Sequence, residues 1–338
     1  MYEALLYQPI AEGEVHCGLC HHRCRIAPGR RGVCGVRENQ AGRLVSLVYG
    51  KLVAEHVDPI EKKPFYHVLP GSRSYSIATV GCNFHCLHCQ NYLISQYPHL
   101  QGGDISGVDR SPQWVVEEAV RGGCASISYT YVEPTIFYEF AHACFTPARE
   151  QGLRNLFVSN GYMTPEAVQH MSPLLDGINI DLKAFSDEFY RRVCKARLEP
   201  VLDNIRLFHD LGVWVEVTTL VIPGHNDSDE ELGSIARFLA ALSLDLPWHV
   251  SGFYPTYQMT DRPPTPVATL EKARKIGCAE GLRHVYIGNA ASAGGADTLC
   301  PGCGALLVHR AGFSGRVTAI TGEGCCHACG QAVAGIWQ

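Results

Sequence analysis

The chain has 338 residues, of which 46% are hydrophobic and 18% are charged, and its formal net charge is −5. This composition is ordinary for a folded globular protein with one large domain and smaller ones. The chain has no run of lysine or arginine, which disfavours a nucleic-acid partner held through phosphate contacts. The first residues do not resemble a signal peptide, and no apolar stretch is long enough to cross a membrane. We therefore expect a cytoplasmic protein.

Cysteine is the unusual component, with 16 residues in the chain. Without a secretion signal, this number favours metal ligation over disulfide bonds. Eleven cysteines form three groups, which are Cys17, Cys20, Cys24 and Cys34; Cys82, Cys86 and Cys89; and Cys300, Cys303, Cys326 and Cys329. The other five lack ligand spacing and are interpreted as small buried hydrophobic residues, namely Cys124, Cys144, Cys194, Cys278 and Cys325.

The first segment, residues 1–71, contains the first cysteine group and little helical periodicity. An alternating run at 43–50 predicts a strand, and Leu69-Pro70-Gly71 predicts a boundary. The four cysteines are separated by two, three and nine residues. Zinc and a second iron–sulfur cluster both accept four cysteines, so the spacing leaves the metal open. We expect an N-terminal four-cysteine module with short strands.

Residues 72–290 alternate strands with helices, which predicts βαβ units and a parallel sheet. Ser111-Pro112, Thr164-Pro165 and Ser228-Asp229 mark helix starts. Six or seven repeats are few for a closed eight-stranded barrel, so we expect an α/β fold with a partial (β/α)6 barrel or an open sheet. Its chemistry should lie at the carboxyl ends of the strands. The seven predicted strands are Tyr75–Gly81, Ala125–Thr130, Asn155–Ser159, Gly177–Leu182, Val213–Val221, His249–Phe253 and Arg283–Ile287.

Three cysteines, Cys82, Cys86 and Cys89, follow the first of these strands on one short loop. Three thiolates could hold three irons of a 4Fe-4S cluster and leave the fourth iron open. The open iron could bind the methionine part of S-adenosylmethionine, and an electron could then release a 5′-deoxyadenosyl radical. A zinc site completed by His85 or His88 and a structural thiol cluster are alternatives. We favour the radical-generating interpretation, because so short a loop leaves little slack to turn either histidine inward.

The CxxxCxxC spacing resembles the signature of the radical SAM superfamily. Four further stretches resemble the radical SAM enzyme of the AmmeMemoRadiSam system, which is itself similar to pyruvate formate-lyase activating enzymes. This resemblance runs over nearly the whole chain. It implies an oxidoreductase-like enzyme, an electron donor of the flavodoxin or ferredoxin class, and Amme and Memo family proteins as partners. The four stretches are Asp-Pro-Ile-Glu-Lys-Lys-Pro at 58–64, Tyr-Thr-Tyr-Val-Glu-Pro-Thr at 129–135, Asn-Ile-Asp-Leu-Lys at 179–183 and Ile-Pro-Gly-His-Asn-Asp at 222–227.

The same resemblance implies contacts to the amino group of the cofactor. In the superfamily a Gly-Gly-Glu motif meets the methionine amino group, and here Tyr131 and Val132 replace the two glycines before Glu133. Glu133 is therefore the expected acceptor, since a carboxylate beside an ammonium is a charge-assisted pair. The alternative is a carboxylate that stabilises the start of a helix. Ser159 and Asn160 match a Thr-Asn-Gly turn that lies near the cofactor in the relatives.

A second set of contacts is implied on the fourth strand. Asp181 and Lys183 alternate, so both point to one face. They match an Asp-x-Lys pair, which places Lys183 at the methionine carboxylate and Asp181 in a supporting contact. A salt bridge between the two is the alternative. His88 stands where the family commonly has an aromatic residue before the last cysteine, and it is expected near the cofactor.

Residues 291–338 begin with a stretch of small residues and contain two CxxC-Gly knuckles with 22 residues between them. Four thiolates complete a tetrahedral zinc site, and the glycines free backbone amides to bond sulfur. We predict a zinc-ribbon-like module in which Cys300, Cys303, Cys326 and Cys329 are the ligands, with an iron–sulfur cluster as the alternative.

The leading hypothesis is a radical SAM enzyme that acts on an unidentified substrate. An activase of a glycyl-radical enzyme is the alternative within that class. A non-catalytic zinc-binding interaction protein is the rival from another class. If its ribbon bound nucleic acid, basic clusters would be expected there. Between residues 301 and 338 the only basic side chains of Lys or Arg type are Arg310 and Arg316, which argues against nucleic acid.

Overall fold

The computed structural model describes residues 2–338, and its centre is an eight-stranded sheet. Seven strands pair in parallel in chain order, and β8 adds to the first of them in antiparallel orientation. Within the described residues, β8 and β16 end the sheet order and are not paired with each other. The strands are β8 (Ala54–Pro59), β9 (Arg73–Ala78), β11 (Ser126–Tyr129), β12 (Arg154–Ser159), β13 (Gly177–Asp181), β14 (Trp214–Val221), β15 (Trp248–Gly252) and β16 (Val285–Gly288).

The predicted α/β fold with a parallel sheet is confirmed, and each of the seven predicted strands overlaps an observed one. The seventh parallel strand, β16, pairs with β15 and continues the sheet, as the seven predicted strands required. β8 was not predicted as a strand. Its sequence ends in Asp58-Pro59, which resembles a turn, but the strand pairs with β9 along its whole length.

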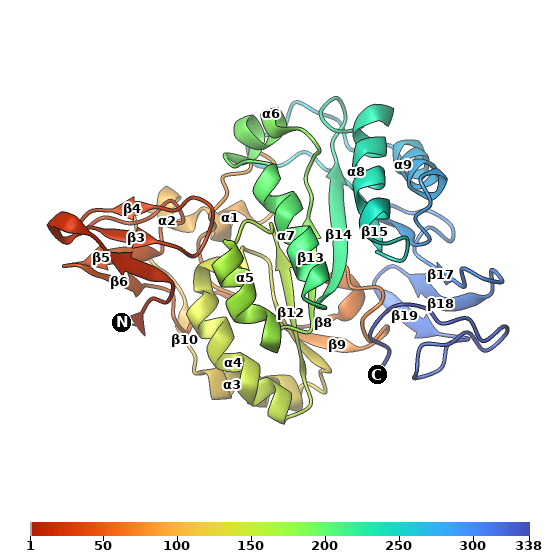
Figure 1. Cartoon of the computed structure of the whole chain (residues 1–338), viewed down its shortest axis with the longest axis horizontal. Coiled ribbons are helices and arrows are strands. Elements are labelled where there is room, and N and C mark those ends of the chain that lie inside the picture. The colour runs from red at the N-terminus through yellow and green to blue at the C-terminus, as the bar shows by residue number, and fades with distance from the viewer. Residues whose placement is uncertain (1) are drawn as a thin grey trace.

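Long helices connect the parallel strands, and α4, α5 and α7 lie in front of the sheet in Figure 1. The predicted starts of three helices are confirmed by their N-caps. The hydroxyls of Ser111, Thr164 and Ser228 each accept a hydrogen bond from the backbone amide three positions later. The helices are α1 (Tyr92–Ser95), α2 (Tyr97–Leu100), α3 (Pro112–Arg121), α4 (Tyr138–Glu150), α5 (Pro165–Met171), α6 (Asp187–Phe189), α7 (Glu199–Asp210), α8 (Asp229–Leu242) and α9 (Val267–Ala279).

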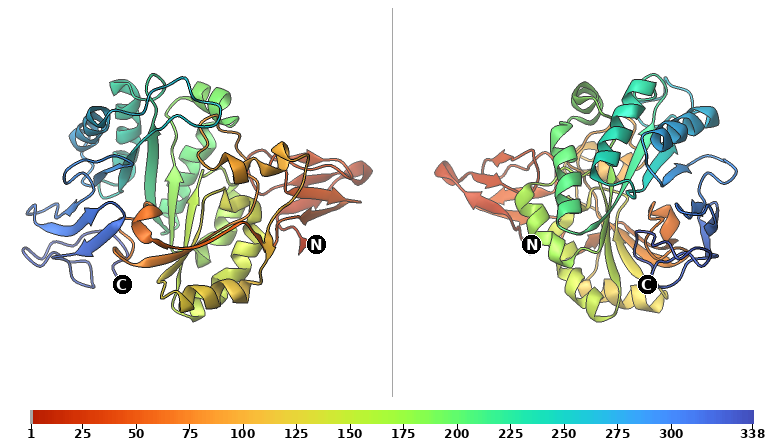
Figure 2. Two further views of the ribbon diagram at one scale, coloured as in Figure 1. Left: turned by 180° about the vertical axis from the view of Figure 1, so that it is seen from behind. Right: turned by 45° about the vertical axis from the view of Figure 1, so that its right-hand side comes forward.

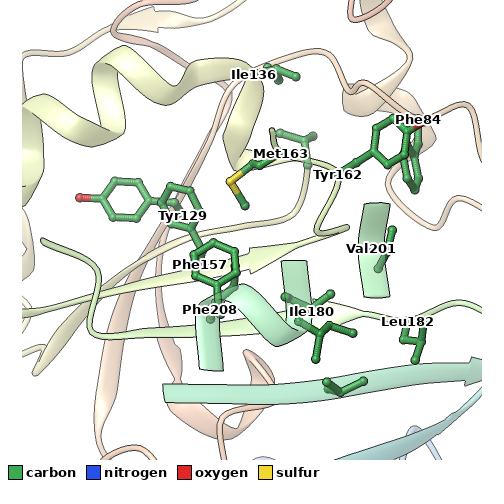
Figure 3. Packing of buried hydrophobic residues seen from close by; sticks show 14 of the residues in the cluster. Phe84, Tyr129, Ile136, Phe157, Tyr162, Met163, Ile180, Leu182, Val201 and Phe208 are labelled. Carbon is green, nitrogen blue, oxygen red and sulfur yellow. The ribbon is translucent and has the colours of Figure 1, made fainter. Parts of the chain in front are cut away.

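The core lies between the sheet and these helices. Figure 3 shows part of it, with Phe157 and Ile180 from adjacent strands beside Phe208 from α7. All three side chains are fully buried, and burial of this kind contributes about 1.5–3 kcal/mol for each side chain. Five shorter helical elements interrupt the connections, namely the 3-10 turns η1 (Ala11–Gly13), η2 (Ile60–Lys62), η3 (Pro134–Phe137) and η4 (Ser172–Leu174) and the π-helix η5 (Tyr190–Cys194).

The N-terminal and C-terminal strands project from opposite sides of the central sheet (Figures 1 and 2). The N-terminal part has two three-stranded sheets and a two-stranded pair, and the C-terminal part has one three-stranded sheet. These strands are β1 (Tyr2–Glu3), β6 (Arg43–Ser46) and β5 (Arg37–Gln40); β2 (Tyr7–Pro9), β3 (Val15–Cys17) and β4 (Arg25–Ile26); β7 (Lys51–Leu52) with β10 (Val108–Asp109); and β17 (Thr298–Leu299), β18 (Leu306–Ala311) and β19 (Ser314–Val317).

The C-terminal strands are joined to the central sheet by a buried polar network. Arg310 donates to the carbonyl oxygen of Tyr66 at 2.6 Å, and its guanidinium lies 4.1 Å from the centre of that ring. The side chains of Arg310 and Glu61 form an ion pair at 3.7 Å, and neither is exposed. The tail pairs with residues before β9, since Ile336 exchanges backbone hydrogen bonds with His67 and Leu69. No helix among residues 2–338 combines the length and apolar character needed to cross a membrane.

Candidate metal centre and cofactor site

The loop with Cys82, Cys86 and Cys89 begins directly after β9, at a glycine that the backbone requires. Gly81 has φ +100°, and a Cβ atom built on it would lie 2.6 Å from Val36 Cγ1. A side chain at this position would therefore both strain the backbone and collide with the N-terminal part. Gly81 lets the chain leave the strand and turn at the carboxyl edge of the sheet, where the chemistry was expected.

Neighbouring elements hold the loop in place. Two backbone amides of the loop donate hydrogen bonds to carbonyl oxygens of the π-helix η5. His85 donates to Cys194 at 3.1 Å, and Leu87 donates to Val193 at 3.0 Å. The His85 ring bonds Gln96 Oε1 at 2.7 Å, so one of its nitrogens is already occupied. A π-helical insertion often marks a functional site.

The three sulfurs are not arranged for a single ion. Within residues 2–338, the C-terminal cysteines form the one group of Cys, His, Asp or Glu whose ligand atoms all lie within 4.8 Å of one another. The loop cysteines therefore lack the close spacing of a mononuclear zinc site, with or without His85 or His88. Wider spacing suits a cluster, because each thiolate then binds a different iron.

The loop sulfurs accept hydrogen bonds, and nearby charged groups shift the pKa values of their thiols. Phe84 N donates to Cys82 Sγ at 3.3 Å, and Cys89 Sγ lies 3.2 Å from Ser95 Oγ. Burial raises the pKa of the Cys82 thiol well above its usual range, and the carboxylate of Glu133 raises it further. A hydrogen bond from Cys194 lowers the pKa of Cys86, and Lys183 adds to that effect. Glu133 and Lys183 therefore lie near different cysteines of one loop.

Glu133, Ser159 and Asn160 lie together, at the ends of β11 and β12. The Glu133 carboxylate is buried and accepts from Thr135 N at 3.0 Å, Ser159 Oγ at 2.8 Å and Asn160 N at 2.7 Å. The Thr135 hydroxyl donates to it as well. Burial raises the pKa of this carboxyl group against those bonds. Glu133 is the N-cap of η3, as the helix-start alternative expected, and it also lies near Cys82.

Asp181 and Lys183 form a salt bridge of 2.9 Å, which is the alternative considered for this pair. The Lys183 side chain is only 14% exposed. Burial alone would lower its pKa, but Asp181 and the thiols of Cys86 and Cys194 outweigh this and raise it well above the usual range. Lys183 is therefore a fixed positive charge, paired with Asp181 and close to the loop.

His88 lies beside the same lysine. It is 4% exposed, and its Nδ1 atom has no hydrogen-bond partner among the described residues. Burial, with the positive charge of Lys183, lowers its pKa to about 3, so the ring is neutral at physiological pH. Its ring centre lies 6.2 Å from that of Phe189.

Two residues near the loop were missed by the sequence analysis. Cys194 is buried, as expected for an ungrouped cysteine, but its thiol also hydrogen-bonds Cys86. Asn83 accepts a bond of 2.7 Å from the side chain of Asn160 and thereby links the loop to the end of β12. The only signal for Asn83 was a polar residue inside the cysteine motif. Cys194 had none, because η5 brings it to the loop from more than 100 positions away.

The C-terminal cysteines have the spacing of a single tetrahedral ion. The sulfurs of Cys300 and Cys329 are 3.6 Å apart, and those of Cys303 and Cys326 are 3.8 Å apart. Four ligands at about 2.3 Å from a tetrahedral zinc ion would place their sulfurs about 3.8 Å apart. These four residues therefore fit one metal ion.

Comparison with known proteins shows the family of this chain. Residues 76–239 match the family model described as the Radical SAM superfamily. The chain is 44% identical over 335 residues to the uncharacterized protein MJ0808 of Methanocaldococcus jannaschii, covering 98% of this chain and 99% of that one. The protein belongs to the radical SAM superfamily, as its cysteine spacing predicted. Membership supports an enzyme, rather than a non-catalytic zinc-binding protein, and implies an iron–sulfur cluster and S-adenosylmethionine.

More distant relatives have functional names. The chain is 25% identical to the putative glycyl-radical enzyme activating enzyme MJ1632 of the same organism, over 54% of this chain and 68% of that one. It is 23% identical to the pyruvate formate-lyase-activating enzyme of Streptococcus mutans, over 54% and 73%. The crystal structure of Streptococcus suis SuiB bound to S-adenosylmethionine has a similar fold, with a TM-score of 0.51 and 11% identity, covering 68% of this chain and 53% of that one.

Proposed function

We propose that the protein binds a 4Fe-4S cluster through Cys82, Cys86 and Cys89 and reductively cleaves S-adenosylmethionine to a 5′-deoxyadenosyl radical. The radical would abstract a hydrogen atom from a substrate that is not yet identified. One observation carries the proposal: the carboxylate of Glu133 and the ammonium of Lys183 come from different strand ends and act on Cys82 and Cys86, in the single loop that holds three free cysteines. When bound, the cluster and the cofactor supply the electron and the carbon radical.

The protein's own contribution begins at the cysteine loop. Three thiolates would leave one iron without a protein ligand, and the amide of Phe84 and the hydroxyl of Ser95 would stabilise negative charge on the sulfurs of Cys82 and Cys89. Cys194 donates to Cys86 in the same way.

Glu133 would hold the ammonium group of the cofactor. Its Oε1 atom accepts three hydrogen bonds, from the amide and hydroxyl of Thr135 and from Ser159. Its Oε2 atom accepts one, from Asn160. A carboxylate oxygen has two lone pairs, so Oε2 retains the capacity for a charge-assisted bond. Ser159 and Asn160 would act by holding that oxygen in position.

Lys183 would bind the carboxylate of the cofactor, with Asp181 orienting the lysine. A primary ammonium has three donors, and the bond to Asp181 uses one of them. His88 is neutral and buried next to Lys183, which suits a planar contact with the cofactor rather than a charge. Together these residues would bind the ammonium and the carboxylate of the cofactor's methionine part.

A second candidate function is activation of a glycyl-radical enzyme. It is favoured by the printed names of two relatives, the glycyl-radical enzyme activating enzyme and the pyruvate formate-lyase-activating enzyme, each matched over 54% of this chain. In that case the abstracted hydrogen belongs to a glycine of a partner protein. Incubation with a candidate partner should then give a protein-bound radical detectable by electron paramagnetic resonance.

On resemblance, we propose Amme and Memo family proteins as partners and a low-potential protein of the flavodoxin or ferredoxin class as the electron donor. Affinity purification of this protein after co-expression with Amme and Memo proteins should recover both. Zinc at the C-terminal cysteines is proposed as a structural ion, because the sulfur spacing fits tetrahedral coordination.

The deciding experiment is anaerobic reconstitution with iron and sulfide, followed by reduction with S-adenosylmethionine present. We expect 5′-deoxyadenosine from the wild type and none from a Cys86→Ala variant. A matched control is Cys278→Ser, since Cys278 is exposed and lies outside the three groups. Equal 5′-deoxyadenosine from the wild type and the Cys86→Ala variant would sink the proposal, as would none from the wild type.

A further inference from the structure

The N-terminal cysteines converge on one cavity, although they are spread over 18 positions of sequence. The cavity is small, with a volume of about 20 Å³. Besides the cysteines, its wall is mostly apolar and includes Leu19, Ile26 and Ile136, with Arg37 as its one charged side chain. Buried thiols around an apolar space are typical of a metal centre shielded from water. The four cysteines in its wall are Cys17, Cys20, Cys24 and Cys34.

Each of the four sulfurs already accepts a hydrogen bond from nitrogen. Val33 N donates to Cys24 Sγ at 3.5 Å, and Arg37 Nη1 donates to Cys17 Sγ at 3.2 Å. The backbone amides of His22 and Val36 donate to Cys20 and Cys34, respectively. Such bonds stabilise thiolates that bind a metal and are a recognised means of tuning iron–sulfur clusters.

The spacing of these sulfurs separates two kinds of metal centre. The C-terminal cysteines lie within 4.8 Å of one another, and their closest sulfur pairs are 3.6 and 3.8 Å apart. Within the described part of the chain no other group meets that condition, so neither the N-terminal group nor the three-cysteine loop does. Four sulfurs that share a cavity but remain apart fit a centre in which each thiolate binds its own iron.

Arg37 adds a buried positive charge to the wall of this cavity. Its side chain is 1% exposed, donates to Leu5 O at 2.7 Å and forms an ion pair with Glu139. Its Nε atom has no hydrogen-bond partner among the described residues. A buried cation is costly unless nearby negative charge compensates it. Glu139 provides one negative charge, and thiolates around an iron–sulfur core would provide more.

We propose that Cys17, Cys20, Cys24 and Cys34 bind a second iron–sulfur cluster, of the four-iron type, next to the loop with Cys82. The two sites are adjacent in the fold, because the backbone of the N-terminal cysteine segment lies against the start of the loop. The carbonyl oxygen of Cys34 lies 3.1 Å from the Cβ position of Gly81, which precedes Cys82. Thr135 lines the N-terminal cavity and bonds Glu133. The cavity and its ligands are independent of the proposed radical chemistry.

The test begins with the whole protein, reconstituted anaerobically, and counts iron, sulfide and zinc. We expect about eight irons, about eight sulfides and about one zinc per chain. About four irons and about two zincs would overturn the proposal, since zinc would then fill the N-terminal site. This measurement needs no variant and is unaffected by a variant that fails to fold.

Two sets of substitutions locate the iron. Replacing Cys82, Cys86 and Cys89 together by alanine should leave about half of the iron and a cluster signal in electron paramagnetic resonance. Replacing the four N-terminal cysteines by alanine should leave the other half. Cys278→Ser is the control and should retain all of it. Loss of all iron in the triple variant would overturn the proposal. Unchanged iron in that variant would instead contradict cluster binding by the loop, so the two proposals fail separately.

Adjacency has its own spectroscopic readout. Two reduced clusters in neighbouring sites should perturb each other magnetically, so the wild-type signal should be broader than the sum of the two variant signals. A wild-type spectrum equal to that sum would overturn the adjacent placement.

Discussion

At the residue scale, Tyr131 adopts a backbone conformation that glycine favours. Its φ is +64°, in the left-handed region, and the superfamily motif that this stretch resembles has glycine at the position. The resulting strain, about 1–3 kcal/mol, must be offset by other contacts. The Tyr131 hydroxyl donates to Asp58, its ring lies 4.0 Å from Lys63 Nζ, and its carbonyl accepts from Asn91 at 2.7 Å. The motif at 58–64 thus holds this turn in place.

The ion pair under Tyr131 predicts a response to acid. Asp58 is buried and contacts Lys63 at 2.6 Å. Burial alone would raise the pKa of Asp58, but hydrogen bonds from Lys62, Lys63 and Tyr131 lower it strongly. A lowered pKa in the folded state stabilises the protein above the unfolded pKa of about 3.9, and this stability is lost as the pH falls below it.

Asp58→Asn should therefore lower the free energy of unfolding by about 3 kcal/mol at pH 7, because Lys63 remains buried without its anion. It should also flatten the dependence of unfolding on pH below about 4. Urea denaturation at several pH values measures both. Asp109→Asn is the matched control, since its carboxylate is 84% exposed in its pair with Lys51, and it should change little. Equal effects of the two variants would contradict a stabilising role for the buried pair of Asp58 and Lys63.

Lys183 gives a prediction for cofactor binding. Lys183→Met keeps much of the side-chain volume but removes the charge, so affinity for S-adenosylmethionine should fall by about tenfold to a hundredfold. Equilibrium dialysis of the reconstituted protein measures this. Lys272→Met is the control, because Lys272 pairs with Asp229 on the exposed surface. Unchanged affinity in Lys183→Met, with the iron content intact, would remove Lys183 from the cofactor site.

At the scale of elements, hydrophobic patterning predicted the seven parallel strands and three helix starts, because alternation and N-caps are local signals. It did not predict β8, whose end is Asp58-Pro59, or the π-helix η5. β8 pairs with β9 along its length, and two carbonyl oxygens of η5 accept hydrogen bonds from the cysteine loop. Both depend on distant segments. The same reason explains why Cys194 was interpreted as a plain buried residue.

The junction of β9 with the cysteine loop gives a prediction at this scale. Gly81→Ala adds strain at φ +100° and a contact of 2.6 Å with Val36, so it should destabilise the protein by about 2–4 kcal/mol. It should also reduce iron retained after reconstitution. Gly152→Ala isolates the strain alone, because its φ is +73° and no atom lies within 4 Å of the added Cβ. That variant should cost about 1–2 kcal/mol. Urea denaturation that ranks the two equally would contradict the close contact.

At the scale of the whole molecule, the sequence indicated three cysteine groups but not how the segments that bear them meet. The N-terminal strands rest on the loop after β9, where Cys34 lies against Gly81, and the C-terminal strands meet the central sheet through Arg310. Arg310 and Tyr66 are 244 positions apart, and no local pattern reports such a contact. Arg310 was counted as one of two basic residues of the ribbon. Because Arg310 is buried, Arg316 is the exposed member of the two. This further weakens the case for a nucleic-acid-binding surface on these strands.

The contact between the C-terminal strands and the central sheet can be tested through Arg310. Its guanidinium binds the Tyr66 carbonyl and Thr298 and pairs with Glu61, and neither charged side chain is exposed. Arg310→Met would leave Glu61 buried without a cation, so the free energy of unfolding should fall by about 3–5 kcal/mol. Urea denaturation measures the loss, and limited proteolysis should cleave the C-terminal segment sooner. Arg316→Met removes the same charge from the exposed surface and should leave both unchanged within about 0.5 kcal/mol. If Arg310→Met resembled Arg316→Met, the buried pair would not hold the C-terminal strands in place. Loss of bound metal together with stability would show that the candidate site at the C-terminal cysteines depends on this contact.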